Sequence, residues 1–579
     1  MEQRKHRVSD KLYNPKKFNN FKEMLKNTAT EFGDEVAFRF KTDKPNVFKE
    51  IKYSEYVYNV NALGTSLISI GLKDKRIGII SENRYEWEEA YLAVTCGTGV
   101  VVPLDRSLPE PEILSLIERS EMEAIFYSSK YDEVMEKVRK ENVGKIKYFI
   151  SMDTEKTIDD IYSQKELIEL GKGLIKNGAK SFVDAKVDSD KMTIMLFTSG
   201  TTSKSKAVAL SQRNVCSNVY DIASVFDITE KDTFLSFLPL HHTFESTVGF
   251  LYPFSVGAKI VFCEGIRHIA DNIREYKISI MVSVPVLFES MYKKIMQTIE
   301  KKGKTKTVKF GMKLSNILLK FGIDIRRKIF AEIHESFGGN VRLFVAGAAA
   351  FEPEVEKGFN SLGIETYQGY GLTEASPVIA AEHKDGAKLG SVGRLFPSME
   401  GKIINPNEQG IGELAVKGPT VMIEYFGNKE ATEETIIDGW LYTGDLAYFD
   451  EDDYLFITGR KKNVIVLKNG KNVYPEEIET LISKIPGVKE NFVFGKPEEN
   501  DENDLKLCAK IVYDKDLVKD VYKTDNEEEL KNKIWEKVKE VNRKMPTYKY
   551  IKEIIITDKE LIKTTTQKVK RFEEIKTIK

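Results

Sequence analysis

Short apolar runs that alternate with helical patterns fill the sequence between Ser54 and Leu455. The runs have the length and the flanking turn residues of buried strands. They include Arg76–Ile80, Val100–Val102, Ala124–Tyr127, Lys259–Phe262 and Val341–Ala346. Alternation of this kind predicts an α/β fold of layered subdomains with mainly parallel sheets. Closely spaced turn signals between Asp438 and Phe456 predict a small β part at the end of this region.

The character of the sequence changes after Gly459. The remaining residues are rich in lysine and glutamate, with short strand-like runs at Asn491–Phe494 and Leu507–Val512 and helical spacing from Glu527 to Lys544. Their size and pattern predict a small α+β domain. We therefore expect an N-terminal domain over residues 1–459 and a C-terminal domain over residues 460–579, linked at Arg460-Lys461-Lys462.

Composition excludes several classes of protein. A net charge of −1 over 579 residues gives no general attraction to nucleic acid. The four cysteines lack C-x-x-C spacing, which argues against a disulfide framework or a zinc site and suits a reducing cytosol. The charged N-terminus is followed by no apolar stretch, and no apolar run reaches the ~18 residues of a membrane-spanning helix. We expect a cytoplasmic protein.

A loop of small hydroxyl residues follows the apolar run Met192–Phe197. It reads Thr198, Ser199, Gly200, Thr201, Thr202, Ser203, Lys204, Ser205 and Lys206, and a second strand-like run, Ala207–Leu210, follows it. Such a loop can direct hydroxyls and backbone N–H groups toward one anion, and glycine lets the backbone approach closely. The G-x-x-x-x-G-K-[ST] pattern and a following helix are both missing, so this is not a Walker loop. We expect a strand–loop–strand cradle for a polyphosphate; the alternative is an ordinary polar hairpin.

Five further motifs occur in a fixed order toward the C-terminus. They are Tyr367–Glu374, Tyr442–Asp445, Gly459–Lys462, Gly470–Glu479 and Lys563–Arg571. In this order they resemble the adenylate-forming superfamily of acyl-CoA synthetases, adenylation domains of peptide synthetases, and luciferases. The resemblance covers nearly the whole chain and is strongest to bacterial long-chain fatty acid–CoA ligases.

The resemblance implies an ATP-dependent, AMP-forming reaction. A medium- to long-chain fatty acid attacks the α-phosphorus of ATP, giving acyl-AMP and pyrophosphate, and the thiol of coenzyme A then displaces AMP. The first step builds negative charge, so it needs fixed donors, a cation and a metal. It also implies that the small domain rotates between two poses. Three alternatives stay open: an acyl carrier protein as acceptor, a luciferase-like oxygenase, and a non-catalytic nucleotide-binding protein.

The resemblance also assigns roles to individual residues around the nucleotide. Thr198 to Lys206 would hold the β- and γ-phosphates, Thr201 and Glu374 would bind Mg²⁺, and Thr373 would touch the α-phosphate. Tyr370 would stack on adenine, and Asp445 would bind the ribose hydroxyls. The other residues expected at the nucleotide or the domain hinge are Gly347, Ala348, Gln368, Gly369, Gly371, Arg460 and Lys462. The alternative for each is a turn, cap or linker residue.

Three residues carry the acyl and thiol steps in this resemblance. Lys568 is the catalytic cation, His242 lines and gates the acyl pocket, and Gly470 lines the path of the thiol of coenzyme A. A plain charge run is the alternative for Lys568, and a buried structural histidine is the alternative for His242. The sequence departs from the family pattern at Ser203, Ser205, Ala207, Ile562 and Gln567.

One stretch has an uneven charge. Between Lys293 and Lys328 there are twelve lysines and arginines but only two acids, Glu300 and Asp324. Apolar residues recur among them at roughly helical spacing: Met312, Leu314, Ile317, Leu318 and Phe321. A solvated helix face packed on the large domain is one interpretation. The other is peripheral contact with an anionic membrane, at its inner face, or with an acidic carrier.

Overall fold

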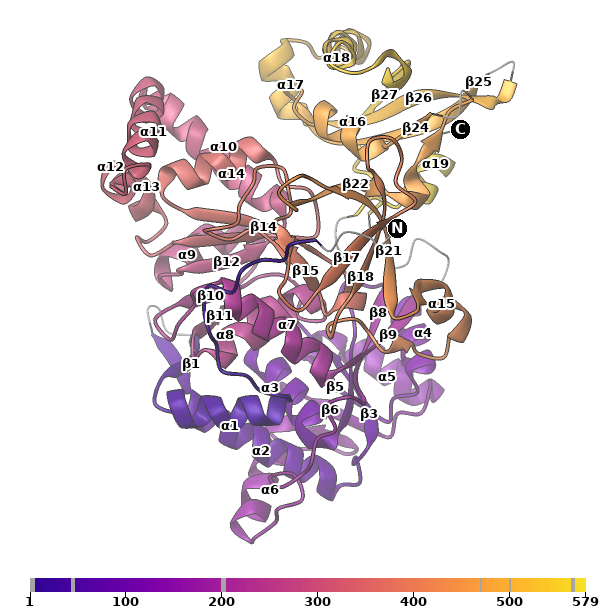
Figure 1. Cartoon of the computed structure of the whole chain (residues 1–579). Coiled ribbons are helices and arrows are strands. Elements are labelled where there is room, and N and C mark those ends of the chain that lie inside the picture. Colours follow the sequence, from indigo (N-terminus) through magenta and orange to yellow (C-terminus); the bar gives the residue numbers. More distant parts are fainter. Residues whose placement is uncertain are drawn as a thin grey trace.

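The computed structural model describes residues 6–42, 47–198, 205–468, 471–498, 501–563 and 568–578. Figure 1 shows a large N-terminal region of layered sheets and helices, with a small C-terminal domain, drawn in orange and yellow, at its upper end. The α/β class and this division of size agree with the sequence prediction. Because β22 (Leu455–Arg460) runs without a break to Arg460, the boundary at residue 459 stays a prediction.

The first large sheet has nine strands among the described residues, and its six central strands are parallel. In spatial order they are β16 (Arg394–Leu395), β15 (Val378–Ala381), β14 (Glu365–Gly371), β13 (Leu343–Ala346), β12 (Ile280–Ser283), β10 (Thr233–Ser236), β11 (Lys259–Phe262), β1 (Val36–Lys41) and β2 (Phe48–Lys52). Parallel strands place their carboxyl ends at one edge of the sheet, which is where α/β proteins bind ligands.

The second sheet carries the hydroxyl-rich loop. Its order is β19 (Glu424–Tyr425), β9 (Lys206–Ser211), β8 (Met192–Thr198), β4 (Gly99–Pro103), β3 (Lys75–Ile80), β5 (Ala124–Tyr127), β6 (Tyr148–Ser151) and β7 (Ile161–Ser163). Strands β8 and β9 pair antiparallel, with Thr198 opposite Lys206. The predicted strand–loop–strand arrangement is therefore confirmed, and the helix α7 (Gln212–Val225) starts only after β9.

The turn-rich segment contributes β21 (Trp440–Phe449) and the start of β22 to a third, antiparallel sheet, so the small β part that its sequence predicts is confirmed. The strands of this sheet are β17 (Glu400–Ile404), β18 (Gly412–Lys417), β21, β20 (Ile436–Ile437) and β22. Register in this sheet places Asp445 of β21 directly opposite Arg460 of β22. Two residues of separate sequence motifs thus become neighbours through strand pairing alone.

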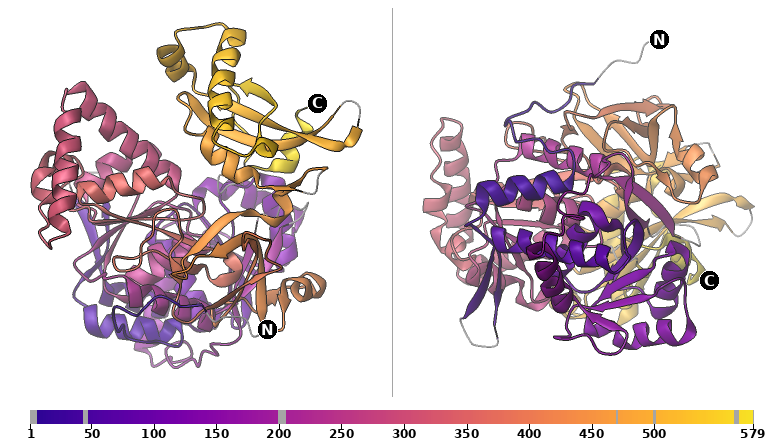
Figure 2. Two further views of the ribbon diagram at one scale, coloured as in Figure 1. Left: turned by 45° about the horizontal axis from the view of Figure 1, so that its top comes forward. Right: turned by 90° about the horizontal axis from the view of Figure 1, so that it is seen from below.

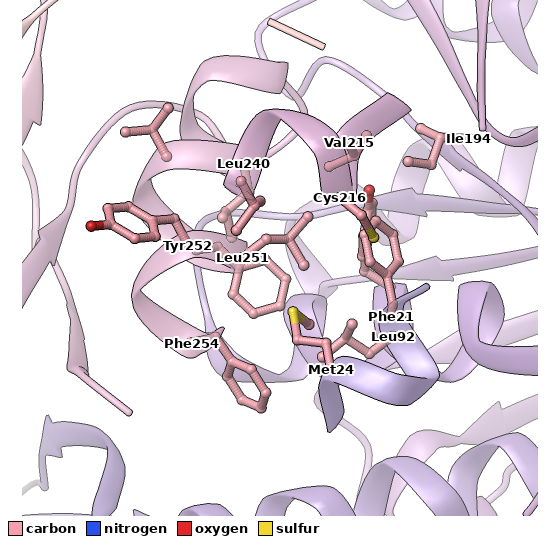
Figure 3. Packing of buried hydrophobic residues seen from close by; sticks show 14 of the residues in the cluster. Phe21, Met24, Leu92, Ile194, Val215, Cys216, Leu240, Leu251, Tyr252 and Phe254 are labelled. Atoms are coloured by element: carbon pink, nitrogen blue, oxygen red, sulfur yellow. The ribbon is translucent and has the colours of Figure 1, made fainter. Parts of the chain in front are cut away.

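Helices cover the sheets and build the main core. They are α1 (Phe21–Phe32), α2 (Tyr53–Ser69), α3 (Tyr85–Ala93), α4 (Glu110–Ser120), α5 (Asp132–Glu141), α6 (Gln164–Lys176), α7, α8 (Tyr252–Ser255), α9 (Ile269–Glu275) and α15 (Lys429–Thr435). The start of α7 is fixed by a reciprocal capping box between Ser211 and Asn214. In Figure 3, Phe21 and Met24 of α1 pack toward Val215 of α7 and Phe254 of α8. The core therefore lies between the two large sheets and supports the loops at their edges.

The C-terminal domain has its own core. Its strands are β23 (Ile465–Val466), β24 (Asn472–Val473), β25 (Val488–Glu498), β26 (Asp501–Tyr513) and β27 (Glu553–Thr557), and its helices are α16 (Pro475–Ile482), α17 (Lys515–Tyr522), α18 (Glu527–Asn542) and α19 (Arg571–Lys576). Ile478 and Ile482 of α16 are buried with Ile534 and Val538 of α18. This arrangement confirms the small α+β domain that the sequence predicts.

A group of helices projects from the large region beside the small domain (Figure 2). It consists of α10 (Pro285–Lys301), α11 (Thr305–Leu319), α12 (Arg326–Ile329), α13 (Ala331–Ser336) and α14 (Pro353–Leu362). The charged stretch of the sequence therefore divides into several helices. Among all helices in the described ranges, none is both long and apolar enough to span a bilayer.

Candidate active site

The carboxyl edge of the first sheet gathers three of the predicted segments. His242 follows β10, Gly347 follows β13, and Thr373 and Glu374 follow β14 in a short 3₁₀ turn, η5 (Thr373–Ala375). Because β10, β13 and β14 are parallel members of one sheet, their carboxyl ends open to the same side. Residues more than a hundred positions apart in sequence are thereby placed around one edge.

Glu374 is held by a tyrosine from the second sheet. The Tyr425 hydroxyl donates to Glu374 Oε1 at 2.8 Å, and the Met422 N–H donates to the Glu374 carbonyl at 2.8 Å. The ammonium of Lys206 lies 4.4 Å from the centre of the Tyr425 ring. Strand β19, which carries Tyr425, therefore joins the end of the hydroxyl-rich loop to the carboxylate.

Asp445 is the centre of a second group. It is buried, accepts from Arg460 Nε at 2.8 Å, and accepts from the Tyr370 hydroxyl at 2.6 Å. Burial raises the pKa of Asp445, although the charge of Arg460 and the hydrogen bond from Tyr370 oppose that rise. Because each carboxylate oxygen accepts from a different donor, the orientation of the Asp445 side chain is fixed. The hydrogen bond from Tyr370 also links β14 to β21.

Lys568 comes to this group from the other domain. Its surroundings lower the pKa of its ammonium, first by desolvation and then through the charge of Arg460, whereas Asp445 and Glu374 act in the opposite sense. The segment carrying Lys568 is anchored on both sides by ion pairs: Lys563 to Glu490 at 2.7 Å and Arg571 to Glu479 at 2.6 Å. Lys563 and Arg571 are therefore structural members of the small domain, whereas Lys568 faces the large one.

Four cations converge around the two acids. Lys462 lies near Arg460 and Lys206, whose charges lower the pKa of its ammonium together with the larger effect of burial. With Lys568, these residues form a set drawn from β9, β22, η6 (Lys461–Asn463) and the C-terminal segment. Like charges held close together are stabilised when a polyanion enters. The arrangement suits a bound polyphosphate.

His242 sits in a histidine and aspartate cluster. Its ring lies 4.1 Å from the ring of His241, centre to centre, and His241 Nε2 is 3.4 Å from Asp105 Oδ1. Burial, then the neighbouring His241, lowers the pKa of His242 to about 3. The imidazole is therefore neutral at physiological pH. Ligand atoms of Asp105, His241 and His242 lie within 4.8 Å of one another.

Glycines permit close packing at the ends of β13 and β14. A Cβ on Gly347 would come within 2.6 Å of the Phe244 ring, and one on Gly371 would come within 1.9 Å of the Pro377 carbonyl oxygen. Ala348 is exposed, with φ +72°. The Gln368 side chain donates instead to the Ser391 carbonyl at 2.7 Å, and its backbone N–H and carbonyl are both hydrogen-bonded to Glu382. Gly369, its neighbour in β14, pairs with Ala381 of β15.

Part of the predicted site lies outside the described residues: Ser199, Gly200, Thr201, Thr202 and Gly470. The two ends of the hydroxyl-rich loop are described. Thr198 Oγ1 donates to the Lys206 carbonyl at 3.4 Å, and Ser205 Oγ accepts from Arg119 at 3.0 Å. Ser205 is one of the departures from the family pattern, and Arg119 holds it in place.

Sequence reasoning missed Tyr425, Arg119 and Asp105. Each acts through a contact made across the fold, to Glu374, Ser205 and His241 respectively. None belongs to the motifs that carry the resemblance. Only the histidine pair at 241 and 242 was visible in the sequence, and it gave no indication of an aspartate partner.

Comparison with known families identifies the class. The sequence profile of the AMP-binding enzyme family matches residues 25–426, and that of the AMP-binding enzyme C-terminal domain matches residues 462–577. The chain belongs to the AMP-binding enzyme family, as its motifs predict. Long-chain-fatty-acid–CoA ligase 5 of Mus musculus is 31% identical over 494 residues, which cover 78% of this chain and 70% of that protein.

Solved structures share the fold at low identity. The anthranilate CoA ligase AuaEII in complex with anthranoyl-AMP aligns with a TM-score of 0.76 at 19% identity, covering 98% of both chains. ATP-bound MatB from Rhodopseudomonas palustris aligns with a TM-score of 0.74 at 22% identity, covering 96% of this chain and 98% of that one. The similarity extends over both the large region and the small domain.

Proposed function

We propose that this enzyme activates a fatty acid with ATP, forming acyl-AMP and pyrophosphate, and then transfers the acyl group to coenzyme A with release of AMP. The observation that carries the proposal is that Lys568 lies near enough to the Arg460–Asp445 ion pair and to Glu374 for their charges to shift the pKa of its ammonium. Family membership supports the reaction type, and the name of the mouse relative supports a long-chain acid.

The residues of the site suit the first step. The ammonium of Lys568 would stabilise the negative charge that develops at the α-phosphoryl oxygens, and Lys206 and Lys462 would stabilise the departing pyrophosphate. Asp445 would accept hydrogen bonds from the ribose hydroxyls, because Arg460 and Tyr370 fix its orientation. Glu374, a hard oxygen donor fixed by Tyr425, fits Mg²⁺, which would supply charge neutralisation when bound.

The small domain is held in this pose by contacts that can exchange. Lys484 of the small domain pairs with Glu352 at 2.9 Å, and Lys461 pairs with Glu413 at 2.7 Å. The Lys484–Glu352 pair lies at the surface, where an ion pair contributes only about 0–1 kcal/mol, whereas Glu413 is buried beneath its exposed lysine partner. We propose that these pairs break when the domain rotates after adenylation, carrying Lys568 away and admitting the thiol.

Substrate and acceptor are tested with one panel of reactions. We expect the rate of AMP release, measured with ATP, Mg²⁺ and coenzyme A, to rise through a graded series of free acids and to be highest for medium or long chains. The reason is that each buried methylene contributes about 0.8 kcal/mol of binding. Highest activity on acetate would contradict the fatty acid assignment.

The same panel separates the acceptors. Replacing coenzyme A with a phosphopantetheinylated acyl carrier protein is expected to lower thioester yield. If carrier protein is acylated while coenzyme A is not, the alternative acceptor is correct and the adenylation step still stands.

A further inference from the structure

Helix α11 carries an outward stripe of apolar side chains. Phe310, Leu314 and Ile317 recur at intervals of four and three residues, which places them on one side of the helix, and Phe321 extends the row into the turn that follows Leu319. They are 67%, 40%, 54% and 77% exposed. An exposed row of this kind marks an interaction surface, because single exposed apolar residues are common but aligned sets are not.

The opposite side of α11 is the side that packs on the protein. Gly311 and Ser315 are buried, and the Asn316 amide donates to Ser361 of α14 at 2.9 Å. A Cβ on Gly311 would lie only 3.2 Å from Ile329 and 3.3 Å from Phe330. Helix α11 therefore packs closely against the protein through its inner face. The apolar stripe lies on the other side, where the neighbouring helices do not cover it.

A row of lysines follows the stripe on one flank. Lys306, Lys309, Lys313 and Lys320 are exposed, and no acidic side chain in the described ranges forms an ion pair with any of them. Other basic residues nearby are occupied: Lys304 pairs with Glu332 at 3.0 Å, and Arg327 donates to the Val341 carbonyl. The lysine row thus has its charge available to a partner, which the sequence alone could not distinguish.

We propose that the α11 surface, defined as Phe310, Leu314, Ile317, Phe321 and the four lysines of the row, binds an anionic lipid bilayer. An apolar stripe beside a basic flank is the pattern of a helix that lies in the membrane interface, with its apolar side among the acyl chains and its lysines at the headgroups. Helix α11 lies at the outer rim of the molecule (Figures 1 and 2), where a flat partner can reach its exposed apolar side.

Binding of the α11 surface to a bilayer can be measured without catalysis, so the test does not depend on the proposed function. The full chain is sedimented with vesicles of phosphatidylcholine alone or mixed with phosphatidylglycerol, at about 0.1 M and about 1 M salt, where the Debye length falls from about 10 to 3 Å. We expect binding to the anionic vesicles at the lower salt. Binding should fall by roughly tenfold or more at the higher salt and in the variant Lys306→Gln, Lys309→Gln, Lys313→Gln, Lys320→Gln, because each basic residue changes association about fivefold.

Two further variants make the result specific. Phe310→Ser with Ile317→Ser and Phe321→Ser should also lose binding, whereas Ile158→Ser with Ile266→Ser, which removes exposed apolar residues elsewhere, should retain it. All variants are checked for an unchanged melting temperature and for unchanged adenylation of a short soluble acid. Failure of the wild-type chain to bind anionic vesicles, or binding that ignores the lysine row and the stripe, would overturn the proposal. If the lysine-row and stripe variants lose acylation of an acidic carrier protein but still bind vesicles, the α11 surface binds a protein partner and the membrane proposal is wrong.

Discussion

Replacing Lys568 with alanine is expected to slow acyl-adenylate formation by about a hundredfold or more, the effect of removing one preorganised charge from a transition state. Of the four cations Lys206, Arg460, Lys462 and Lys568, only Lys568 comes from the body of the small domain. It lies near Asp445 and Glu374. The variant should still convert supplied acyl-AMP and coenzyme A to thioester, because that step uses the rotated pose. Pyrophosphate exchange measures the first step, and thioester formation from acyl-AMP measures the second.

A neighbouring lysine provides the control. Lys570 pairs with Glu573 at 3.4 Å on the same segment, and Lys570→Ala should leave both half-reactions near normal. The pH dependence gives an independent check. Because the pKa of Lys568 is lowered, the wild-type exchange rate should fall on the alkaline side before the pH range of an ordinary lysine, and Lys568→Arg should lack that fall. Equal loss of both half-reactions in Lys568→Ala would refute the assignment.

Replacing Glu374 with glutamine is expected to lower pyrophosphate exchange by about a hundredfold and to raise the Mg²⁺ concentration needed for half-maximal rate. The amide keeps the shape of the side chain but removes the negative oxygen that a hard cation prefers. Initial rates over a Mg²⁺ titration measure both effects.

Tyr425→Phe is the matched variant, because it removes only the hydroxyl that donates to Glu374 at 2.8 Å. Losing one hydrogen bond to a charged group costs about 1.5–3 kcal/mol, so a loss of at least about tenfold is expected. An unchanged Mg²⁺ requirement in Glu374→Gln would mean that this carboxylate is not a metal ligand.

The order of secondary structure followed from local patterns. Strands such as Ala124–Tyr127 and Lys259–Phe262 were predicted at their observed positions, because each is a short apolar run between turn residues. Longer-range features were less accessible. Strand β26 begins at Asp501, six residues before the apolar run Leu507–Val512 from which a strand is predicted. Its earlier part is a strand because it pairs with β25, and that pairing cannot be predicted from polar residues.

The candidate site also has a part that the sequence predicts and a part that it does not. Glu374, Asp445 and Lys568 belong to motifs and could be named from the sequence, whereas their supports could not. The bond from Tyr425 exists because β19 pairs with β9, a contact between segments more than two hundred residues apart. Gln368 shows the opposite case: its motif marked it for the ligand, but its side chain is committed to Ser391.

The central claim is tested most directly by the products formed from ATP. The wild-type enzyme, given a long-chain fatty acid, coenzyme A and Mg²⁺, is expected to yield AMP, pyrophosphate and acyl-CoA in equal amounts, with no ATP consumed when the acid is omitted. Separation of nucleotides and thioesters by chromatography measures all of them in one reaction. Formation of ADP and phosphate, or consumption of ATP that does not depend on the acid, would contradict the account.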